Sequence, residues 1–347
     1  MAKRNFLLVA IVSIIILTTS CNGATKQQAA NTNDVYVVGY EMNKQYKTVA
    51  KLWHNGEAQN LSDGTTNMQS NSTFVSGNDV YVVGYENNDY GVQIAKLWKN
   101  GVVQNLTNGT NSAYASSVFV SGNDVYVVGH EKITTWMPIL WKNSVAQKLT
   151  DGNHYAMATS VYVYNDDVYV VGCEENKQGK CVAKVWKNGV GKNLTNGTCD
   201  AIAKSIFVSD GNVYVVGWEE NEQSANDYGN IKVAKVWKNE VVQNLTDGSK
   251  SAECSSVFVT NNDVYIVGYE SKDKSDYFVG DSIVAKLWKN GIEQSLSDGT
   301  DKAWAKSVYI LNNDVYVAGF DGNDAILWKN GVAQKISKGT AECVFVK

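Results

Sequence analysis

The chain has 347 residues and a formal charge of −4 at pH 7, and Arg4 is its only arginine. Nucleic-acid binding needs a basic face, and bidentate binding of phosphate or carboxylate depends largely on arginine. The composition therefore excludes nucleic acid as a partner, and it excludes sites of the sialidase type, in which arginines clamp a carboxylate. The 29 glycines and the single proline favour many short strands joined by tight turns.

The N-terminus has the order of a processing signal. Two basic residues precede an apolar stretch, and a short run of small residues follows it. About a dozen apolar residues are too few to span a hydrocarbon core of ~30 Å as a helix. The arrangement resembles a bacterial lipoprotein signal, which implies removal of residues 1–20, lipidation of Cys21 and a linker over 21–33. Thr18 stands where such signals usually carry an apolar residue, so an ordinary secretory signal stays open as the alternative.

One segment, Asp-Val-Tyr-Val-Val-Gly, recurs with small changes through the rest of the chain. Its seven copies start at Asp34, Asp79, Asp124, Asp167, Asn212, Asp263 and Asp314. Repeats of 40 to 50 residues suit one four-stranded blade of a β-propeller, and a nearly continuous apolar run suits a strand buried on both faces. Residues 34–347 are therefore predicted to form an all-β, seven-bladed β-propeller of four-stranded antiparallel blades.

Each repeat divides into four strands, A to D. In the third repeat they are expected at 117–120, 125–129, 139–141 and 145–149. The C-to-D turn is Asn-Gly in five repeats, and Asn-Gly accepts the positive φ that a type I′ hairpin needs at both central positions. Asn143-Ser144 and Asn239-Glu240 replace it in repeats three and five, where we expect slightly less stable turns.

Aromatic residues recur at fixed positions of the repeat. Strand C contributes Trp53, Trp98, Trp141, Trp186, Trp237, Trp288 and Trp328, and strand B contributes one tyrosine per repeat. Strand A contributes Phe74, Phe119, Tyr162, Phe207, Phe258, Tyr309 and Phe345. Residues that recur in every blade are expected to pack between blades rather than to bind a ligand.

The two ends of the chain complement each other. The first repeat begins at strand B, with Asp34, and lacks a strand A. The last residues, 343–347, have the pattern of a strand A. The C-terminal strand is therefore expected to complete the first blade beside Val35 to Val38 and to close the ring.

The repeats resemble those of the seven-bladed propeller lipoproteins found in bacterial genomes. The resemblance covers residues 34–347 and rests on the G-Y-E, K-L-W-K-N-G and N-L-T-D-G-T signatures. It implies the fold and a location in the bacterial cell envelope, either periplasmic or on the surface. It implies no particular activity, because propellers serve many functions.

Strand directions alternate, so the connections fall at two ends of the ring. We call the end with the B-to-C and D-to-A connections the loop face, and the end with the A-to-B and C-to-D turns the turn face. The loop-face connections vary in length and composition, so function is expected there.

Strand B ends on the loop face with an acid in every repeat, namely Glu41, Glu86, Glu131, Glu174, Glu219, Glu270 and Asp321. These carboxylates could form a ring that binds a divalent cation. Alternatively, each could pair with the lysine that five repeats carry on strand C, and we favour these ion pairs.

Repeat three departs most from the pattern. It has His130 and Glu131 at the end of strand B, and His154 lies in the next D-to-A connection. Two imidazoles and a carboxylate could bind a divalent metal ion. No tight spacing motif supports that site, so solvated loop histidines are the favoured interpretation, and no other cofactor is expected.

The position near the start of strand A differs in every repeat, with Gln69, Tyr114, Met157, Ile202, Glu253 and Trp304. If strand A is innermost, these residues surround the loop-face mouth of the central channel and would select a ligand. Tyr114 and Trp304 could stack on a sugar or an aromatic group. The alternative is that a channel edge tolerates any residue.

Two further features stay open. The B-to-C loops at 219–231 and 270–283 are long, polar and tyrosine-containing, which is typical both of binding loops and of idle surface loops. Cys173 and Cys181 flank another B-to-C loop and could form a disulfide across its hairpin. The spacing of the remaining cysteines predicts no pairing.

These observations lead to one expected function and two alternatives. The favoured hypothesis is a lipid-anchored extracytoplasmic module that binds a protein or a glycan through the loop face, with the bilayer as a second partner through Cys21. The first alternative is a hydrolase that acts on glycans with two carboxylates. The second is a structural protein of the envelope. The three histidines supply no convincing Ser-His-Asp set.

Overall fold

The computed structural model describes residues 33–226, 229–272 and 283–347. The predicted signal 1–20, the lipidation site Cys21 and nearly all of the linker lie outside the described residues. Within those residues the strands form seven four-stranded antiparallel sheets without a helix. Accordingly, the described chain has no helix long and apolar enough to cross a membrane.

The blades are numbered along the chain, with their strands given from the innermost outward. Blade one consists of β28 (Thr340–Val346), β1 (Val35–Met42), β2 (Thr48–His54) and β3 (Glu57–Asn60). Blade two consists of β4 (Met68–Ser76), β5 (Asp79–Asn87), β6 (Gln93–Lys99) and β7 (Val102–Asn105). Blade three consists of β8 (Ala113–Ser121), β9 (Asp124–Lys132), β10 (Trp136–Lys142) and β11 (Val145–Lys148).

The remaining blades repeat this order. Blade four consists of β12 (Ala156–Tyr164), β13 (Asp167–Glu175), β14 (Cys181–Lys187) and β15 (Val190–Asn193). Blade five consists of β16 (Ala201–Ser209), β17 (Asn212–Asn226), β18 (Gly229–Lys238) and β19 (Val241–Asn244). Blade six consists of β20 (Ala252–Thr260), β21 (Asp263–Ser271), β22 (Ile283–Lys289) and β23 (Ile292–Ser295). Blade seven consists of β24 (Ala303–Leu311), β25 (Asp314–Asp321), β26 (Asp324–Lys329) and β27 (Val332–Lys338).

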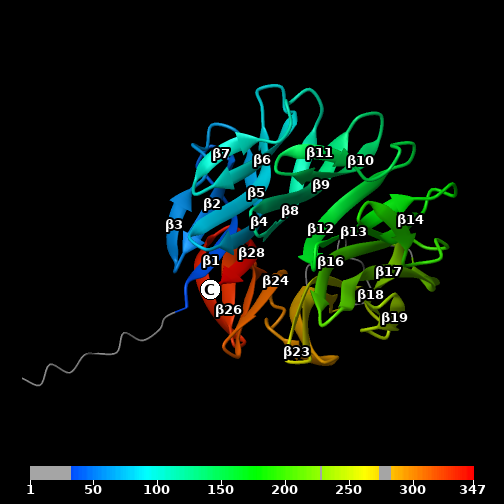
Figure 1. Cartoon of the computed structure of the whole chain (residues 1–347). Coiled ribbons are helices and arrows are strands. Elements are labelled where there is room, and N and C mark those ends of the chain that lie inside the picture. The colour runs from blue at the N-terminus through cyan, green and yellow to red at the C-terminus, as the bar shows by residue number, and fades with distance from the viewer. Residues whose placement is uncertain (1–32, 227–228, 273–282) are drawn as a thin grey trace, which may run out of the picture. The chain divides into compact units, whose positions relative to one another are not determined.

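The ring closes as the chain ends predict. Strand β28 pairs with β1, with Phe345 opposite Tyr36, and Figure 1 shows the two strands side by side. The backbone N–H of Asp34 donates to the carbonyl of Lys347 at 2.8 Å, and Lys347 donates back to Asp34 at 3.0 Å. The first blade therefore contains both ends of the ring, and no inner strand is left without a neighbour on either side.

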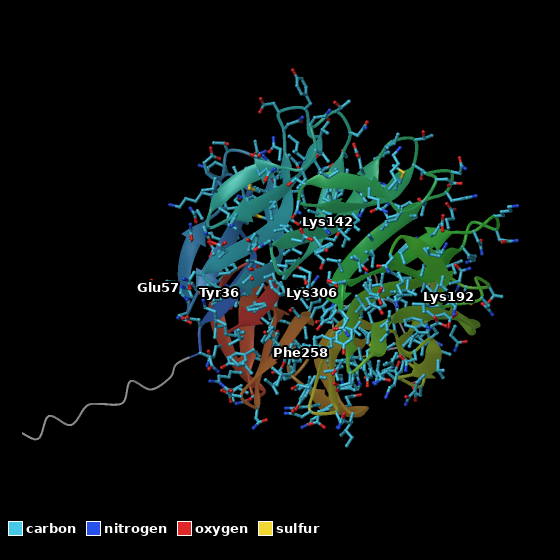
Figure 2. All side chains as sticks on the ribbon, viewed as in Figure 1. Tyr36, Glu57, Lys142, Lys192, Phe258 and Lys306 are labelled. Carbon is cyan, nitrogen blue, oxygen red and sulfur yellow. The ribbon has the colours of Figure 1, made fainter. Side chains whose placement is uncertain are left out.

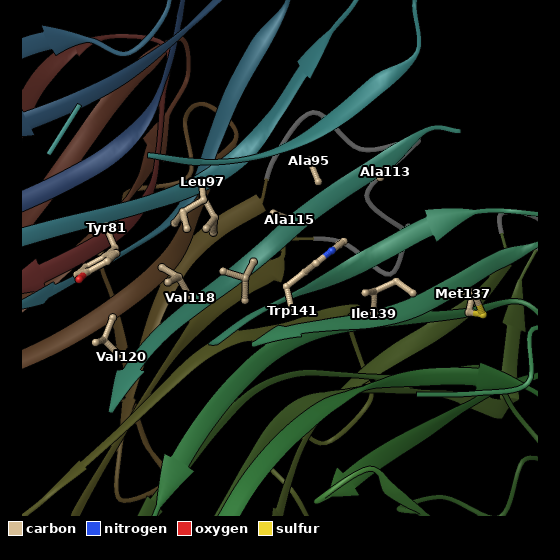
Figure 3. Close-up of a cluster of buried hydrophobic side chains, with 12 residues drawn as sticks. Tyr81, Ala95, Leu97, Ala113, Ala115, Val118, Val120, Met137, Ile139 and Trp141 are labelled. Atoms are coloured by element: carbon tan, nitrogen blue, oxygen red, sulfur yellow. The ribbon is translucent and has the colours of Figure 1, made fainter. Parts of the chain in front are cut away.

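The repeated aromatic residues pack between blades, as predicted. All seven strand-C tryptophans are at most 1% exposed. Figure 3 shows one inter-blade cluster, in which Tyr81 and Leu97 of blade two pack with Val118 and Trp141 of blade three. Burying one tryptophan removes roughly 200 Å² from water, which contributes several kcal/mol at ~25 cal/mol per Å².

The strand-A aromatics form a closed ring of contacts about the central axis. Successive ring centroids, from Phe74 through all seven blades to Phe345 and back, lie 4.8 to 5.0 Å apart. This closed chain of contacts places strand A innermost. Figure 2 agrees, with Phe258 and Lys306 toward the middle of the ring and Glu57 and Lys192 at its outer edge.

Steric crowding explains why the repeated segment ends in glycine. A Cβ atom on Gly129 would lie 1.8 Å from the carbonyl oxygen of Tyr114 on the paired inner strand. The equivalent distance is 1.8 to 2.0 Å in all seven blades, far too short for any side chain. In blades two to seven, the carbonyl that faces the glycine belongs to the variable residue of strand A. A β-bulge follows two residues later on that strand. Glycine therefore fixes the depth of that variable residue.

A polar network on the turn face accounts for the other repeated residues. In blade three, Asn143 donates to Asp124 at 2.7 Å and accepts from the backbone N–H of Val125 at 2.9 Å. The ammonium of Lys142 lies 2.7 Å from the same Asp124 carboxylate. Both Asn143 and Ser144 have positive φ, at 49° and 67°, so the turn keeps the predicted hairpin geometry without glycine.

Candidate functional site

The acids at the end of strand B form the ion pairs that the sequence favours. The distances are 2.7 Å for Glu41–Lys51, 2.5 Å for Glu86–Lys96, 3.0 Å for Glu219–Lys235 and 3.5 Å for Glu270–Lys286, and Glu174–Lys184 is also paired. Blades three and seven lack the lysine. In blade three, Glu131 instead accepts a hydrogen bond from Asn111 at 3.3 Å. The ion-pair prediction is confirmed, and most of the acidic ring is therefore internally neutralised.

Asp321 of blade seven differs from the other strand-B acids. Partial burial and the nearby carboxylates of Asp298, Asp301 and Asp324 raise its pKa above the usual value. Asp324 itself is held by Lys335 and Lys338 at 2.8 and 2.7 Å. Blade seven thus carries a carboxyl group on the loop face that takes up a proton more readily than an ordinary aspartate.

The six variable residues of strand A occupy equivalent places in the ring. Each is the second residue of its strand and lies opposite the residue that follows the strand-B glycine, as Tyr114 lies opposite His130. Glu253 is buried, and the other five are half-buried: Gln69, Tyr114, Met157, Ile202 and Trp304. The sequence therefore placed these residues correctly on the inner strands, while their contacts decide what each can bind.

Tyr114 belongs to an aromatic cluster that joins blades two and three. Its ring centroid lies 4.7 Å from Tyr85, 5.2 Å from His130 and 5.4 Å from Trp136. Burial lowers the pKa of His130 to about 4, so this imidazole is neutral at pH 7. Neighbouring side chains thus already occupy much of the surface that Tyr114 would offer a ligand.

The predicted metal ligands gain no support from this geometry. Among the described residues, no group of three or more His, Cys, Asp or Glu side chains could hold a metal ion. His130 packs on Tyr114 and Trp136, at 5.2 and 5.0 Å between centroids, and Glu131 is bonded to Asn111. His154 is half-buried in the D-to-A connection that leads into blade four.

Trp304 of blade seven, like Tyr114, packs against neighbouring side chains. Its indole N–H donates to Ser255 Oγ at 2.6 Å, and Tyr269 packs edge-on at 4.7 Å. The ammonium of Lys306 lies 3.9 Å from its ring centroid, a cation–π contact. One face of the indole is therefore covered, which reduces the area that a sugar could stack on.

Glu253 is 5% exposed and sits in a polar network. Its carboxylate accepts from Lys232 at 2.8 Å and from the Tyr269 hydroxyl at 3.0 Å. Burial acts to raise the pKa of Glu253, but the charges of Lys204 and Lys232 and these hydrogen bonds outweigh it, so the pKa lies below its usual value. The group is an ionised structural carboxylate rather than a proton donor.

Sequence reasoning missed a second ring of variable residues. At the bulge of every inner strand, one residue lies outside the pairing, and in order these are Asn71, Ser116, Thr159, Lys204, Ser255, Lys306 and Glu342. Lys306 and Glu342 lie 3.6 Å apart, and Asn71 donates to the carbonyl of Ala115 at 2.9 Å. These residues also differ between blades, with five residue types in seven blades, and that variation is the signal that could have found them.

Among the described residues, the most exposed aromatic residues of the loop face are Tyr46 and Tyr90, in the B-to-C connections of blades one and two, at 83% and 92%. Met42, at the end of β1, and Ile133, just after β9, are 61% and 49% exposed. We call these four residues the loop-tip patch. Tyr46 has a φ of 60°, in the left-handed region that is uncommon for a bulky side chain. The equivalent position in blades two and four is glycine, Gly91 and Gly179, with φ of 77° and 75°.

A polar cavity of about 390 Å³ is lined by residues next to both tyrosines in the chain. Its lining includes Lys47, next to Tyr46, and Asp89 and Gly91, which flank Tyr90. Asn87 also lines it, and the Asn87 Oδ1 atom is buried without a hydrogen-bond partner among the described residues. The amide and hydroxyl groups of the other lining residues suit a ligand that carries hydrogen-bonding groups.

The remaining predicted features lie in or beside B-to-C connections. The predicted loop at 219–231 is largely a hairpin, because β17 and β18 continue their pairing to Asn221 and Ile231 and beyond. The loop at 270–283 lies mostly outside the described residues. Cys173 and Cys181 are free thiols that lie close enough for each to shift the pKa of the other, so the two predicted partners are near one another.

Comparisons with known proteins support the fold alone. The chain is similar to the β-propeller domain of the Trilobed protease from Pyrococcus furiosus, described as having an open velcro topology, with a TM-score of 0.53, 10% identity and coverage of 87% of this chain and 93% of that one. A weaker likeness, with a TM-score of 0.48 and 11% identity, is to Kuenenia stuttgartiensis hydrazine synthase, of which the chain covers 46%. No protein-family model and no curated protein sequence matches.

Proposed function

We propose that this β-propeller is a lipid-anchored, extracytoplasmic binding module of a bacterial cell envelope, and that it takes a protein or glycan ligand on the loop-tip patch. The observation that carries this proposal is Tyr46. A bulky residue at positive φ costs about 1–2 kcal/mol, and it is kept here although two other blades use glycine at the same place. Tyr46 is 83% exposed, so packing against the rest of the described chain offsets little of that cost.

The surroundings of Tyr46 support a polar ligand. Tyrosines supply a large contact area at low entropic cost, and they are typical of protein-binding and sugar-binding surfaces. The cavity near them is lined by amide and hydroxyl groups, among them those of Thr65, Asn67 and Asn88. Peptide backbones and sugars both carry hydrogen-bonding groups that match such a lining. The anchor through Cys21 would keep the ring at the bilayer and leave the ligand to the loop face.

The proposal is tested by two binding assays on the same variants. Purified chain is applied to a glycan array and used to capture proteins from envelope extract, with Tyr46→Gly and Tyr90→Ser beside wild type. Loss of one specific signal in both variants supports the proposal. Val190→Ser on the turn face is the matched control and should bind normally. A signal retained in both tyrosine variants but lost in Trp304→Ala and Tyr114→Ala would move the site to the inner strands.

One observation favours the hydrolase as a second candidate. Inverting and retaining glycosidases need one carboxyl group with a raised pKa to protonate the leaving oxygen, beside a second carboxylate. Asp321, with its raised pKa and neighbouring Asp298 and Asp301, has that character. Turnover of an envelope glycan that Asp321→Asn abolishes while binding persists would support this candidate over the binding module.

A further inference from the structure

The turn face carries a second set of exposed apolar residues that no ligand-binding role explains. The first residue of the outermost strand is aliphatic in six blades, namely Val102, Val145, Val190, Val241, Ile292 and Val332. All six are 66 to 76% exposed. We call these residues the aliphatic rim. In blade one the equivalent residue is Glu57, also exposed. Single exposed valines are ordinary on a protein surface, but here the same register in six successive blades places an aliphatic residue on the same face of every one of them.

Each rim residue lies directly opposite a lysine of the adjacent strand. Lys99 lies opposite Val102, Lys187 opposite Val190 and Lys289 opposite Ile292. These three lysines are 50 to 52% exposed, and each pairs with an aspartate at 2.7 or 2.8 Å. Aliphatic side chains next to lysines with long apolar stems are typical of surfaces that meet the boundary of a lipid bilayer. Because the lysines are already paired, such a surface does not depend on anionic lipid.

The chain enters the ring on this same face. Asn33, the first described residue, donates to the Tyr316 hydroxyl at 3.2 Å and accepts from Asn312 at 3.3 Å. Asn312 belongs to the A-to-B turn of blade seven, which lies on the turn face. Only the eleven residues 22–32 lie between a lipidated Cys21 and Asn33. Even fully extended, they reach about 40 Å, so an anchored ring stays near the headgroups.

We infer that the aliphatic rim rests on the lipid bilayer, so that the turn face points toward the membrane and the loop face points away from it. This inference rests on the proposed lipid anchor and extends it from a tether to a defined orientation. The anchor supplies the high local concentration that a weak apolar contact needs. The loop-tip patch, with Tyr46 and Tyr90, is then presented on the side that a ligand can reach.

The test uses hydroxyl-radical oxidation of the lipidated full chain on vesicles of saturated phosphatidylcholine, with the Cys21→Ser chain in solution as reference. On vesicles, oxidation of Val102, Val190 and Ile292 should fall at least threefold, while Tyr46 and Tyr90 keep their reactivity. Protection should be equal at low and high salt. The mass of the N-terminal peptide reports lipidation separately, so a failed anchor is distinguished from a failed orientation.

A rim variant provides the control. The lipidated chain with Val102→Gln, Val190→Gln and Ile292→Gln should lose the protection of the three remaining rim residues, Val145, Val241 and Val332. Four outcomes would overturn the inference: equal oxidation of the rim on vesicles and in solution, protection of Tyr46 and Tyr90 instead of the rim, protection that disappears at high salt, or protection that persists in the triple variant.

Discussion

Lys192 and Glu240 form an ion pair that joins the outer strand of blade four to the C-to-D turn of blade five. Across blades two and three, Gln104 donates to Ser144 at 3.1 Å in the equivalent place. The other turns have glycine there. Both turns without glycine therefore have a side-chain contact with the preceding blade.

The turn geometry gives a first prediction. Glu240 has a φ of 69°, which costs about 1–2 kcal/mol for a non-glycine residue, whereas an exposed ion pair contributes about 0–1 kcal/mol. Glu240→Gly should therefore raise the free energy of unfolding by up to ~1 kcal/mol in urea titrations. Lys192→Ala is the control, because it breaks the ion pair without relaxing the turn. It should not raise the free energy of unfolding. A Glu240→Gly chain that unfolds at lower urea than wild type would contradict this account.

Tyr46 gives a second prediction, in which stability and binding change in opposite directions. Tyr46→Gly removes a strained φ and loses little packing, so the free energy of unfolding should rise by about 1 kcal/mol. Ligand binding should weaken. The reverse substitution, Gly91→Tyr in blade two, should lower the free energy of unfolding by a similar amount. Lower stability of Tyr46→Gly would show that the ring makes contacts worth more than its strain.

A third prediction concerns pH and His130. Burial lowers the pKa of His130 to about 4, so the unfolded chain, with a pKa near 6.5, takes up the proton first as the pH falls. The stability that His130 contributes is full above about pH 7 and is lost as the pH falls through 6.5 toward 4, by up to about 3 kcal/mol.

The variant His130→Tyr checks this prediction, because blade two has Tyr85 at the equivalent position. The thermal midpoint of wild type should fall more steeply between pH 7 and pH 4 than that of His130→Tyr. His154→Tyr is the matched control and should keep the wild-type slope. Parallel curves for wild type and His130→Tyr would mean that another group causes the acid sensitivity.

Ring closure gives a fourth prediction. Deletion of residues 341–347 removes most of β28 and with it Phe345, which contacts both Phe74 and Tyr309. The loss should lower the free energy of unfolding by several kcal/mol, a large part of the 5–15 kcal/mol typical of a folded domain. Calorimetry measures the shift, and Glu342→Gln, on the same strand, should change it by less than ~1 kcal/mol. An unchanged midpoint in the truncated chain would contradict the closed ring.

The repeated residues made most of the fold predictable. Each Asn-Gly turn, each strand-C tryptophan and each Glu–Lys pair meets the same neighbours in successive blades, so one repeat predicts the contacts of the others. The missing first strand A predicted the pairing of β28 with β1. The candidate site was predicted less well. Trp304 and Tyr114 lie on the inner strands as expected, but each ring packs against a tyrosine of the preceding blade, Tyr269 and Tyr85 respectively.

The sequence by itself determined the number of blades, the closure of the ring and the positions that vary, because these follow from local periodicity and from residues that recur. Only the tertiary structure decided which residues are exposed on the loop face. Exposure depends on side chains that arrive from the adjacent blade, about one repeat away along the chain, and on backbone angles such as the positive φ of Tyr46. Neither quantity can be read from the residue itself, and for that reason the loop-tip patch was found only in the folded chain.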